Sequence, residues 1–333
     1  YRLDPGTGQT SEIAIPVANA NPRAIEIDSL GQPWVVLGMP KKLAVMSADS
    51  QWRTFDVGMY PHSLAVDRRG KVWFNGHFTH SPELIGNVDA GTGKVATFEV
   101  PAHPGLGQGP GGPIPYEIRV GPDGKIWGSE LLGNRIFAFD GVTGKFEVFP
   151  LPLPHSGPRR LDVDAGGIVW IPSYAANGVL RFDPRARTFT EIPLPLRDAI
   201  PYIIRVDHAS GALWIGTAAA DALLRYDPAT RRFESYRLPS RGAVIRHLAI
   251  GAARSGLGSI RRITRYSRAN RSRTSTIAGQ TPTVGETDGQ QDIMQPERSG
   301  RPSHCYGHLR LQRWSRGAPS YDCVTGGRGT RFR

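Results

Sequence analysis

Histidine, arginine and tyrosine recur at one position of a repeated pattern, directly after a proline or in the equivalent register. The residues at this position are Arg23, His62, Tyr116, Arg159, Tyr202 and Arg246. Histidine is the commonest general base in enzymes, and arginine can hold a carboxylate through two parallel N–H groups. These residue types therefore predict a site for an anionic or carbonyl-rich ligand. The alternative is that the arginines pair with nearby acidic residues on the surface.

A second group of candidates follows the tryptophan of two repeats. His77 and His80 form an H-x-x-H motif soon after Trp73, and Glu130 lies three residues after Trp127. Imidazole and carboxylate groups are ligands for divalent metals, so these residues with His62 are a candidate metal site. Solvated loop histidines are the alternative interpretation. The sequence contains no serine nucleophile elbow, P-loop or C-x-x-C motif. The chemistry that depends on those motifs is therefore not supported.

An internal repeat supplies the elements that must position these side chains. Each copy reads Pro, an apolar pair, Gly, and then Trp three residues after the Gly. The five copies are PRAIEIDSLGQPW (22–34), PHSLAVDRRGKVW (61–73), PYEIRVGPDGKIW (115–127), PRRLDVDAGGIVW (158–170) and PYIIRVDHASGALW (201–214). Successive tryptophans are 39, 54, 43 and 44 residues apart. A sixth copy begins at 244–251 and stops before its Trp.

The second half of each copy alternates apolar residues around a turn built on Asp with Gly or Pro, as in VLRFDPRARTFTEIPLP. Two hairpins per copy give four strands about every 40–45 residues, which is typical of a β-propeller blade. The sequence therefore predicts an all-β propeller with five whole blades and two half blades. The segment YRLDPGTGQTSEIAIP is the N-terminal half blade, and residues 1–251 form the propeller. The tryptophan is predicted to fill the space between blades.

This architecture places the candidate residues together. The first two strands of a blade are antiparallel neighbours, so the start of the first and the end of the second lie on one face. We therefore expect the six post-proline positions around one mouth, together with His77, His80, Glu130 and Tyr174. Glu117 and Arg119, which alternate on the first strand of the third copy, are expected to pair across strands.

The charge is concentrated outside the repeat. The whole chain carries a formal charge of +12, but residues 252–333 hold 15 Arg and 5 acidic residues, a net charge of +10. Only 10 residues of this tail are Leu, Ile, Val or Phe, which is typical of a disordered chain. A native disordered tail, a nucleic-acid-binding arm and an out-of-frame translation remain as interpretations. The break inside a predicted hairpin favours the last.

Composition excludes several classes of protein. No apolar run reaches the roughly 18–20 residues needed to span a bilayer, and two Cys cannot form a disulfide framework. The chain begins with Tyr1 and shows no signal peptide, so a mature form or a fragment is expected. The nearly neutral propeller predicts a small-molecule or peptide-like ligand and a monomer, with no nucleic acid and no membrane. We expect a periplasmic or secreted location, with a cytoplasmic one also open.

The repeat resembles a known family. The pattern P-[HY]-x-[IL]-x-V-x-x-x-G-x-[VI]-W, followed by G-N-R-I and by [FY]-D-x-x-T-G, is similar to that of the virginiamycin B lyase (streptogramin lyase) family. PYEIRVGPDGKIWGSELLGNRIFAFDGVTGKFEVFPLP (115–152) is the most similar stretch, and the resemblance covers about 1–251. It implies a seven-bladed propeller and a Mg²⁺-dependent elimination that opens the ester of a cyclic depsipeptide.

The resemblance transfers to single residues only in part. It implies a working histidine after the proline of late blades, whereas here only His62 fits, in an early blade, and His247 is one residue off register. Tyr60 replaces the family's metal-holding Glu, and Glu130 fits a second family Glu. The candidate catalytic residues are thus His62 and His247, and the candidate metal ligands are Glu130, His77 and His80. The family's late catalytic segment would fall in the tail.

Three functions follow as hypotheses. The first is a metal-assisted C–O lyase of the streptogramin lyase kind, inactive if the missing segment is essential. The second is a non-catalytic ligand-binding or protein-interaction propeller. The third, a gluconolactonase-like Ca²⁺ hydrolase, has only Glu130 in its support.

Overall fold

The computed structural model describes residues 1–4, 7–79, 82–107 and 112–250. The contacts divide the chain into two units, Tyr1–Asn270 and Arg271–Arg333, and every described residue belongs to the first. The basic tail predicted at 252–333 lies outside the described residues. The described residues form strands and no helix, so the all-β prediction is confirmed. Accordingly, they include no helix capable of crossing a membrane.

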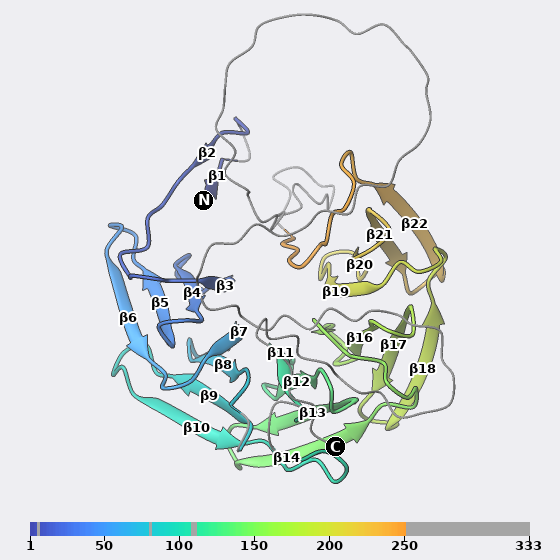
Figure 1. Cartoon of the computed structure of the whole chain (residues 1–333), viewed down its shortest axis with the longest axis horizontal. Helices are drawn as coiled ribbons and strands as arrows, with labels where there is room; N and C mark the ends of the chain where they lie inside the picture. The colour runs from blue at the N-terminus through green and yellow to red at the C-terminus, as the bar shows by residue number, and fades with distance from the viewer. Residues whose placement is uncertain (5–6, 80–81, 108–111, 251–333) are drawn as a thin grey trace, which may run out of the picture. The chain divides into compact units, whose positions relative to one another are not determined.

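Five four-stranded antiparallel sheets follow one another along the chain, each with its strands in sequence order (Figure 1). The first sheet is β3 (Pro22–Ile27), β4 (Pro33–Leu37), β5 (Lys42–Met46) and β6 (Trp52–Asp56). The second sheet is β7 (Pro61–Val66), β8 (Val72–Gly76), β9 (Leu84–Val88) and β10 (Val95–Glu99). The predicted propeller blades are therefore confirmed in number and in strand order.

The remaining three sheets repeat the same plan. The third sheet is β11 (Pro115–Val120), β12 (Ile126–Glu130), β13 (Arg135–Asp140) and β14 (Lys145–Pro150). The fourth is β15 (Asp162–Val163), β16 (Val169–Ser173), β17 (Gly178–Asp183) and β18 (Thr188–Pro193). The fifth is β19 (Pro201–Val206), β20 (Leu213–Thr217), β21 (Ala222–Asp227) and β22 (Arg232–Arg237). In Figure 1 the first strands β3, β7, β11 and β19 lie innermost, and the fourth strands of the sheets lie outermost.

An aspartate at the first turn of most sheets ties the hairpin to its tryptophan. In the second sheet, Asp67 Oδ1 accepts from the main-chain N–H groups of Arg69 and Lys71 at 2.9 and 3.0 Å. Its Oδ2 accepts from Trp73 Nε1 at 3.0 Å. The turn closes on Gly70, whose φ of 77° is a conformation that favours glycine. One carboxylate therefore fixes both the turn and the indole orientation.

The tryptophans pack between sheets, as predicted from their spacing. Trp73 of the second sheet meets Phe139 of the third edge to face at 5.8 Å between ring centroids. Trp127 meets Phe182 of the fourth sheet in the same way at 6.0 Å. Aromatic pairs of this kind add to the stabilisation from buried area. The tryptophans of the second, third and fourth sheets therefore each pack against an aromatic ring of the next sheet.

The two predicted half blades have different outcomes. The N-terminal segment forms a short hairpin of β1 (Arg2–Leu3) and β2 (Thr10–Ser11), as expected. Residues 244–250, expected to start a sixth blade, form no strand, because no following strand pairs with them among the described residues. The segment is nevertheless anchored: Ile245 is 2% exposed, and its N–H donates to Thr217 O at 3.1 Å.

Candidate functional site

The first strands of the sheets start with a proline and an irregularity in pairing. The interrupted steps are Pro22/Ile25 in β3, Pro61/Leu64 in β7, Pro115/Glu117 in β11 and Pro201/Ile203 in β19. Proline is tolerated at the first residue of a strand, and a bulge redirects a side chain away from the regular ladder. The bulges fall at the post-proline positions that the sequence singled out. Local geometry therefore directs these side chains away from the regular ladder positions.

The fourth sheet departs further from the regular plan. Before β15, Pro158 pairs with Ser173 of its own sheet, whereas Arg160 forms a parallel bridge with Ile203 of the fifth sheet. The Arg160 N–H donates to Tyr202 O at 3.1 Å, and the Ile204 N–H donates to Arg160 O at 2.9 Å. This bridge carries Arg159 to the side of Tyr202.

Arg159 is the centre of an arginine–tyrosine cluster, which consists of Tyr116, Arg159, Tyr174, Tyr202 and Arg246. Its Cζ lies 3.8 Å from the ring centroid of Tyr174 and 4.8 Å from that of Tyr202. Its Nη1 donates to the Tyr116 hydroxyl at 3.0 Å, and that hydroxyl is hydrogen-bonded to the hydroxyl of Tyr202. Arg246 Cζ lies 5.6 Å from the Tyr202 ring centroid. The cluster thus brings predicted arginines and tyrosines together and combines cations with aromatic faces.

Solvent reaches only some members of this cluster. Tyr116 and Tyr202 are each 5% exposed, whereas Arg159, Tyr174 and Arg246 are partly exposed. A ligand would therefore first meet the two guanidinium groups and the Tyr174 ring.

His62 and His77 form a stacked pair beside Tyr116. The two ring centroids are 4.3 Å apart, and the His62 ring lies 4.5 Å from that of Tyr116. His62 Nδ1 lies 2.8 Å from Tyr116 O, and His77 Nδ1 lies 3.1 Å from Pro115 O. Because a carbonyl oxygen only accepts hydrogen bonds, both Nδ1 atoms carry the proton, and Nε2 is the basic nitrogen of each neutral ring.

Burial holds both rings in the neutral form. It lowers the pKa of His77 from 6.5 to about 3 and the pKa of His62 well below its usual value. For His62, the charge of Arg160 adds to this effect. The pair is therefore a site of neutral imidazoles next to a group of fixed cations.

His247, the other candidate catalytic residue, lies near the first sheet. Its Nε2 is 2.9 Å from Arg23 O, so this nitrogen donates and Nδ1 is the basic one. Burial, and next the charge of Arg160, lower the pKa of His247. The candidate residues Arg23 and His247 are thus brought together, although they are 224 positions apart.

A buried carboxylate that the sequence analysis linked only to Arg119 connects three sheets. Glu117 is 1% exposed and accepts from Arg160 Nη1 at 2.7 Å and from Arg205 Nη2 at 2.9 Å. The expected pair with Arg119 also forms, at 3.1 Å, although within one strand and not across strands. Arg119 in turn pairs with Glu26 of the first sheet. The sequence did carry a signal for this network, because charged residues recur along the first strands of successive sheets, at Glu26, Glu117, Arg119 and Arg205.

Glu130 does not occupy the position expected of a metal ligand. It lies opposite Arg135 in the β12–β13 register, and Arg135 holds both of its carboxylate oxygens, with Nη2 to Oε1 at 2.9 Å and Nε to Oε2. The side chain is fully buried. The ion pair arises because β13 begins with an arginine at the position facing the end of β12. The carboxylate is therefore already neutralised by a cation.

The predicted metal site of Glu130, His77 and His80 stays a prediction, because one of its members, His80, lies outside the described residues. Within the described ranges, no group of three or more His, Cys, Asp or Glu is placed to hold a metal ion.

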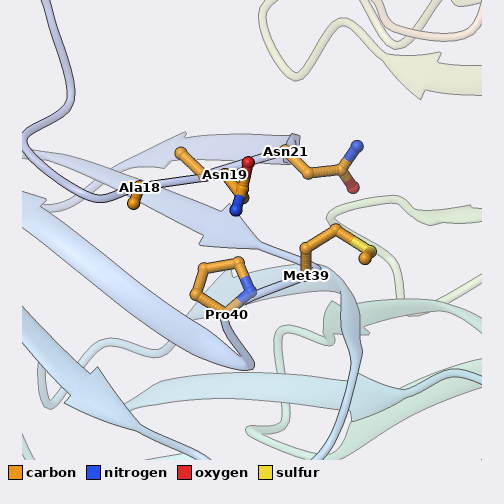
Figure 2. Close-up of a pocket in the computed structure, with 6 residues that line it drawn as sticks. Ala18, Asn19, Asn21, Met39 and Pro40 are labelled. Atoms are coloured by element: carbon orange, nitrogen blue, oxygen red, sulfur yellow. The ribbon is translucent and has the colours of Figure 1, made fainter. Parts of the chain in front are cut away.

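Two shallow cavities lie away from the arginine–tyrosine cluster. The first, of about 540 Å³, is lined by residues from the turns around β3 and β4, including Asn19, Asn21 and Met39 (Figure 2). The second, of about 470 Å³, is lined by Glu26, Arg119 and Asp162 among others. Neither contains the stacked histidines, so the candidate site is defined by contacts between side chains.

Known proteins resemble this propeller in sequence and in structure. The model of the Virginiamycin B lyase family matches residues 107–256, which include the third, fourth and fifth sheets. Virginiamycin B lyase from Staphylococcus aureus has a similar structure, with a TM-score of 0.63 over 71% of this chain and 76% of that chain, at 22% identity. The chain therefore has a β-propeller fold similar to that of virginiamycin B lyase. No curated protein sequence matches this propeller significantly.

Two further solved structures resemble the propeller of this chain. A streptogramin B lyase structure matches with a TM-score of 0.64 and 22% identity, covering 73% of this chain and 76% of that chain. A catalytically inactive virginiamycin B lyase from Staphylococcus aureus with Quinupristin matches with a TM-score of 0.60 and 21% identity, covering 69% and 75%. At these identities the likeness to solved structures shows the fold.

Proposed function

We propose that this propeller binds a cyclic depsipeptide or a similar peptide-like ester and opens its ester bond by C–O elimination. The observation that carries the proposal is the neutral His62 ring, held by the Tyr116 carbonyl beside the arginine–tyrosine cluster. A base with a defined tautomer next to a fixed cation suits removal of a proton α to a carbonyl.

The elimination reaction consumes no water. The Nε2 atom of His62 takes the proton from the α-carbon, and the Arg159 guanidinium stabilises the developing enolate oxygen. The electron pair then forms a C=C bond as the bond between the β-carbon and the ester oxygen breaks. The ester oxygen leaves as part of a carboxylate. The Tyr174 and Tyr202 rings hold apolar parts of the ligand during these steps.

The Mg²⁺ ion that the resemblance implies does not fit the described residues. Mg²⁺ prefers oxygen ligands, mainly carboxylates and waters. Glu117 and Glu130 are both paired with arginines, and the described groups around Tyr116 are guanidinium, imidazole and phenol groups without a carboxylate. We therefore assign no step to a metal, and Arg159 supplies the positive charge.

A non-catalytic ligand-binding propeller is the second candidate. Burial lowers the pKa of His62, and a base with a low pKa removes a carbon-bound proton less efficiently. In this case the cluster would bind the same class of ligand without turnover.

One experiment separates the two candidates. The full chain is incubated with a streptogramin B depsipeptide, with and without Mg²⁺, and the products are analysed by chromatography and mass spectrometry. Elimination gives a linear product with the mass of the substrate, whereas hydrolysis adds one water. Binding in calorimetry without a linear product would favour the second candidate. His62→Gln should abolish turnover, while the matched control His155→Asn, at an exposed position, should not.

A further inference from the structure

Two adjacent arginines have N–H groups without an acceptor. Among the described residues, the buried polar side-chain atoms that lack a hydrogen-bond partner include the Nε atoms of Arg159 and Arg160. Arg160 is 3% exposed. The two Cζ atoms lie 5.3 and 5.8 Å from the Tyr116 ring centroid, so both guanidinium groups approach one tyrosine. A buried donor without a partner costs free energy that a ligand with an acceptor would recover.

Positive charge exceeds negative charge around these groups. No described carboxylate lies within ion-pairing distance of Arg159 or Arg246. Arg160 pairs with Glu117, but that carboxylate is shared with Arg119 and Arg205. The cluster therefore lacks an anion that would complete its pairing.

Aromatic surface limits the kind of anion. Arg159 Cζ lies 3.8 and 4.8 Å from the ring centroids of Tyr174 and Tyr202, which are 6.0 Å apart, so the two rings flank the guanidinium on adjoining sides and leave room for a planar acceptor on another side. A carboxylate matches this arrangement because its two oxygens can accept parallel N–H groups. An apolar or aromatic substituent on the acid would then contact the partly exposed Tyr174 ring.

We propose that Arg159, Arg160 and Arg246 form a carboxylate subsite for an N-acylated amino acid or a peptide C-terminus with an apolar side chain. The inference rests on the proposed function, since the same cluster would receive the carboxylate that ester elimination releases. It adds a chemical class of ligand that binds without any reaction.

The test compares a matched acid and amide. The full chain is titrated by calorimetry with N-acetylphenylalanine and with N-acetylphenylalanine amide. Hydrogen bonds to charged groups predict at least about tenfold tighter binding of the acid. Arg159→Gln should remove this preference, and Arg246→Gln should weaken it. The matched control Arg187→Gln, which alters an exposed arginine on another aromatic ring, should retain it.

Several outcomes would overturn the subsite. Equal affinity for acid and amide, no binding of the acid, or an acid preference that survives in folded Arg159→Gln would each contradict it. Circular dichroism establishes folding of each variant, and Arg246→Gln tests the subsite if Arg159→Gln does not fold. Acid-selective binding without depsipeptide turnover would refute the lyase alone. Turnover without acid preference would refute the subsite alone.

Discussion

His62 Nδ1 lies 2.8 Å from the main-chain carbonyl oxygen of Tyr116, a residue of the following sheet. The contact fixes the tautomer of His62 and joins the candidate base to the cluster that would bind the ligand. The geometry of the base therefore depends on the packing of two blades and not on one loop.

Replacing His62 tests its role in proton transfer. If His62 is the base, His62→Gln should lower kcat for depsipeptide elimination by about 100-fold or more. Gln can donate to the Tyr116 carbonyl as the imidazole does, so the dissociation constant should change little. Stopped assays of linear product and calorimetry measure the two quantities. An unchanged kcat would assign the proton transfer to another group.

Acidification should destabilise the propeller through its buried histidines. The pKa of His77 is about 3 in the folded state and about 6.5 when unfolded. Between these values the unfolded chain binds a proton that the folded chain does not, so stability is full above pH 6.5 and falls as the pH decreases. The expected loss is about 1.4 kcal/mol per pH unit for this residue. Urea unfolding between pH 7 and 5 measures it.

A non-titrating variant isolates the contribution of His77. His77→Gln keeps a donor for the Pro115 carbonyl, so its unfolding free energy should depend less steeply on pH. The exposed residue His208 provides the control, because His208→Gln should leave the slope as in the parent chain. Identical slopes in all three proteins would contradict the neutral assignment of His77.

Glu117→Gln should strongly destabilise the fold. The substitution leaves the Arg160 and Arg205 charges buried without a carboxylate. Removing one partner of a buried ion pair lowers the free energy of unfolding by about 3–5 kcal/mol. Denaturant titration measures the loss. The control Glu234→Gln breaks an exposed pair with Arg225 and should have little effect. Similar results for the two variants would show that the Glu117 network is not structural.

Asp67→Ala should destabilise the second sheet by about 2 kcal/mol, because two turn N–H groups and the Trp73 indole lose their acceptor. Asp123→Ala is the comparison in the third sheet, where the carboxylate holds a single turn N–H, of Lys125, at 3.1 Å. Thermal unfolding should give a clearly larger loss for Asp67→Ala. Equal losses would mean that the link to the indole contributes nothing.

The sheets were predictable because their signals are local. Proline starts the first strand, an Asp–Gly turn closes the hairpin, and Trp73 and its counterparts recur at blade spacing. Segment 244–250 has the same apolar pattern, but a pattern alone does not supply the neighbouring strand that a ladder needs.

The location of the candidate site could be predicted better than the contacts that its side chains make. Residues after the prolines do converge, since Tyr116 and Tyr202 meet through their hydroxyls. The Glu130–Arg135 pair was missed, because it depends on the register of one hairpin and on side-chain direction. The binding of both Arg160 and Arg205 to Glu117 was missed for a similar reason. The two arginines follow Glu117 by 43 and 88 positions in the sequence.

The parallel bridge between Arg160 and Ile203 gives the fourth and fifth sheets main-chain hydrogen bonds in common. Opening either sheet must break bonds of the other, so the two should unfold as one cooperative unit. The amide hydrogens of Arg160 and Ile204 would then exchange with solvent at the rate of that joint opening. Arg159, Tyr174 and Tyr202 of the arginine–tyrosine cluster belong to this unit and would keep their mutual geometry for as long as the unit stays closed.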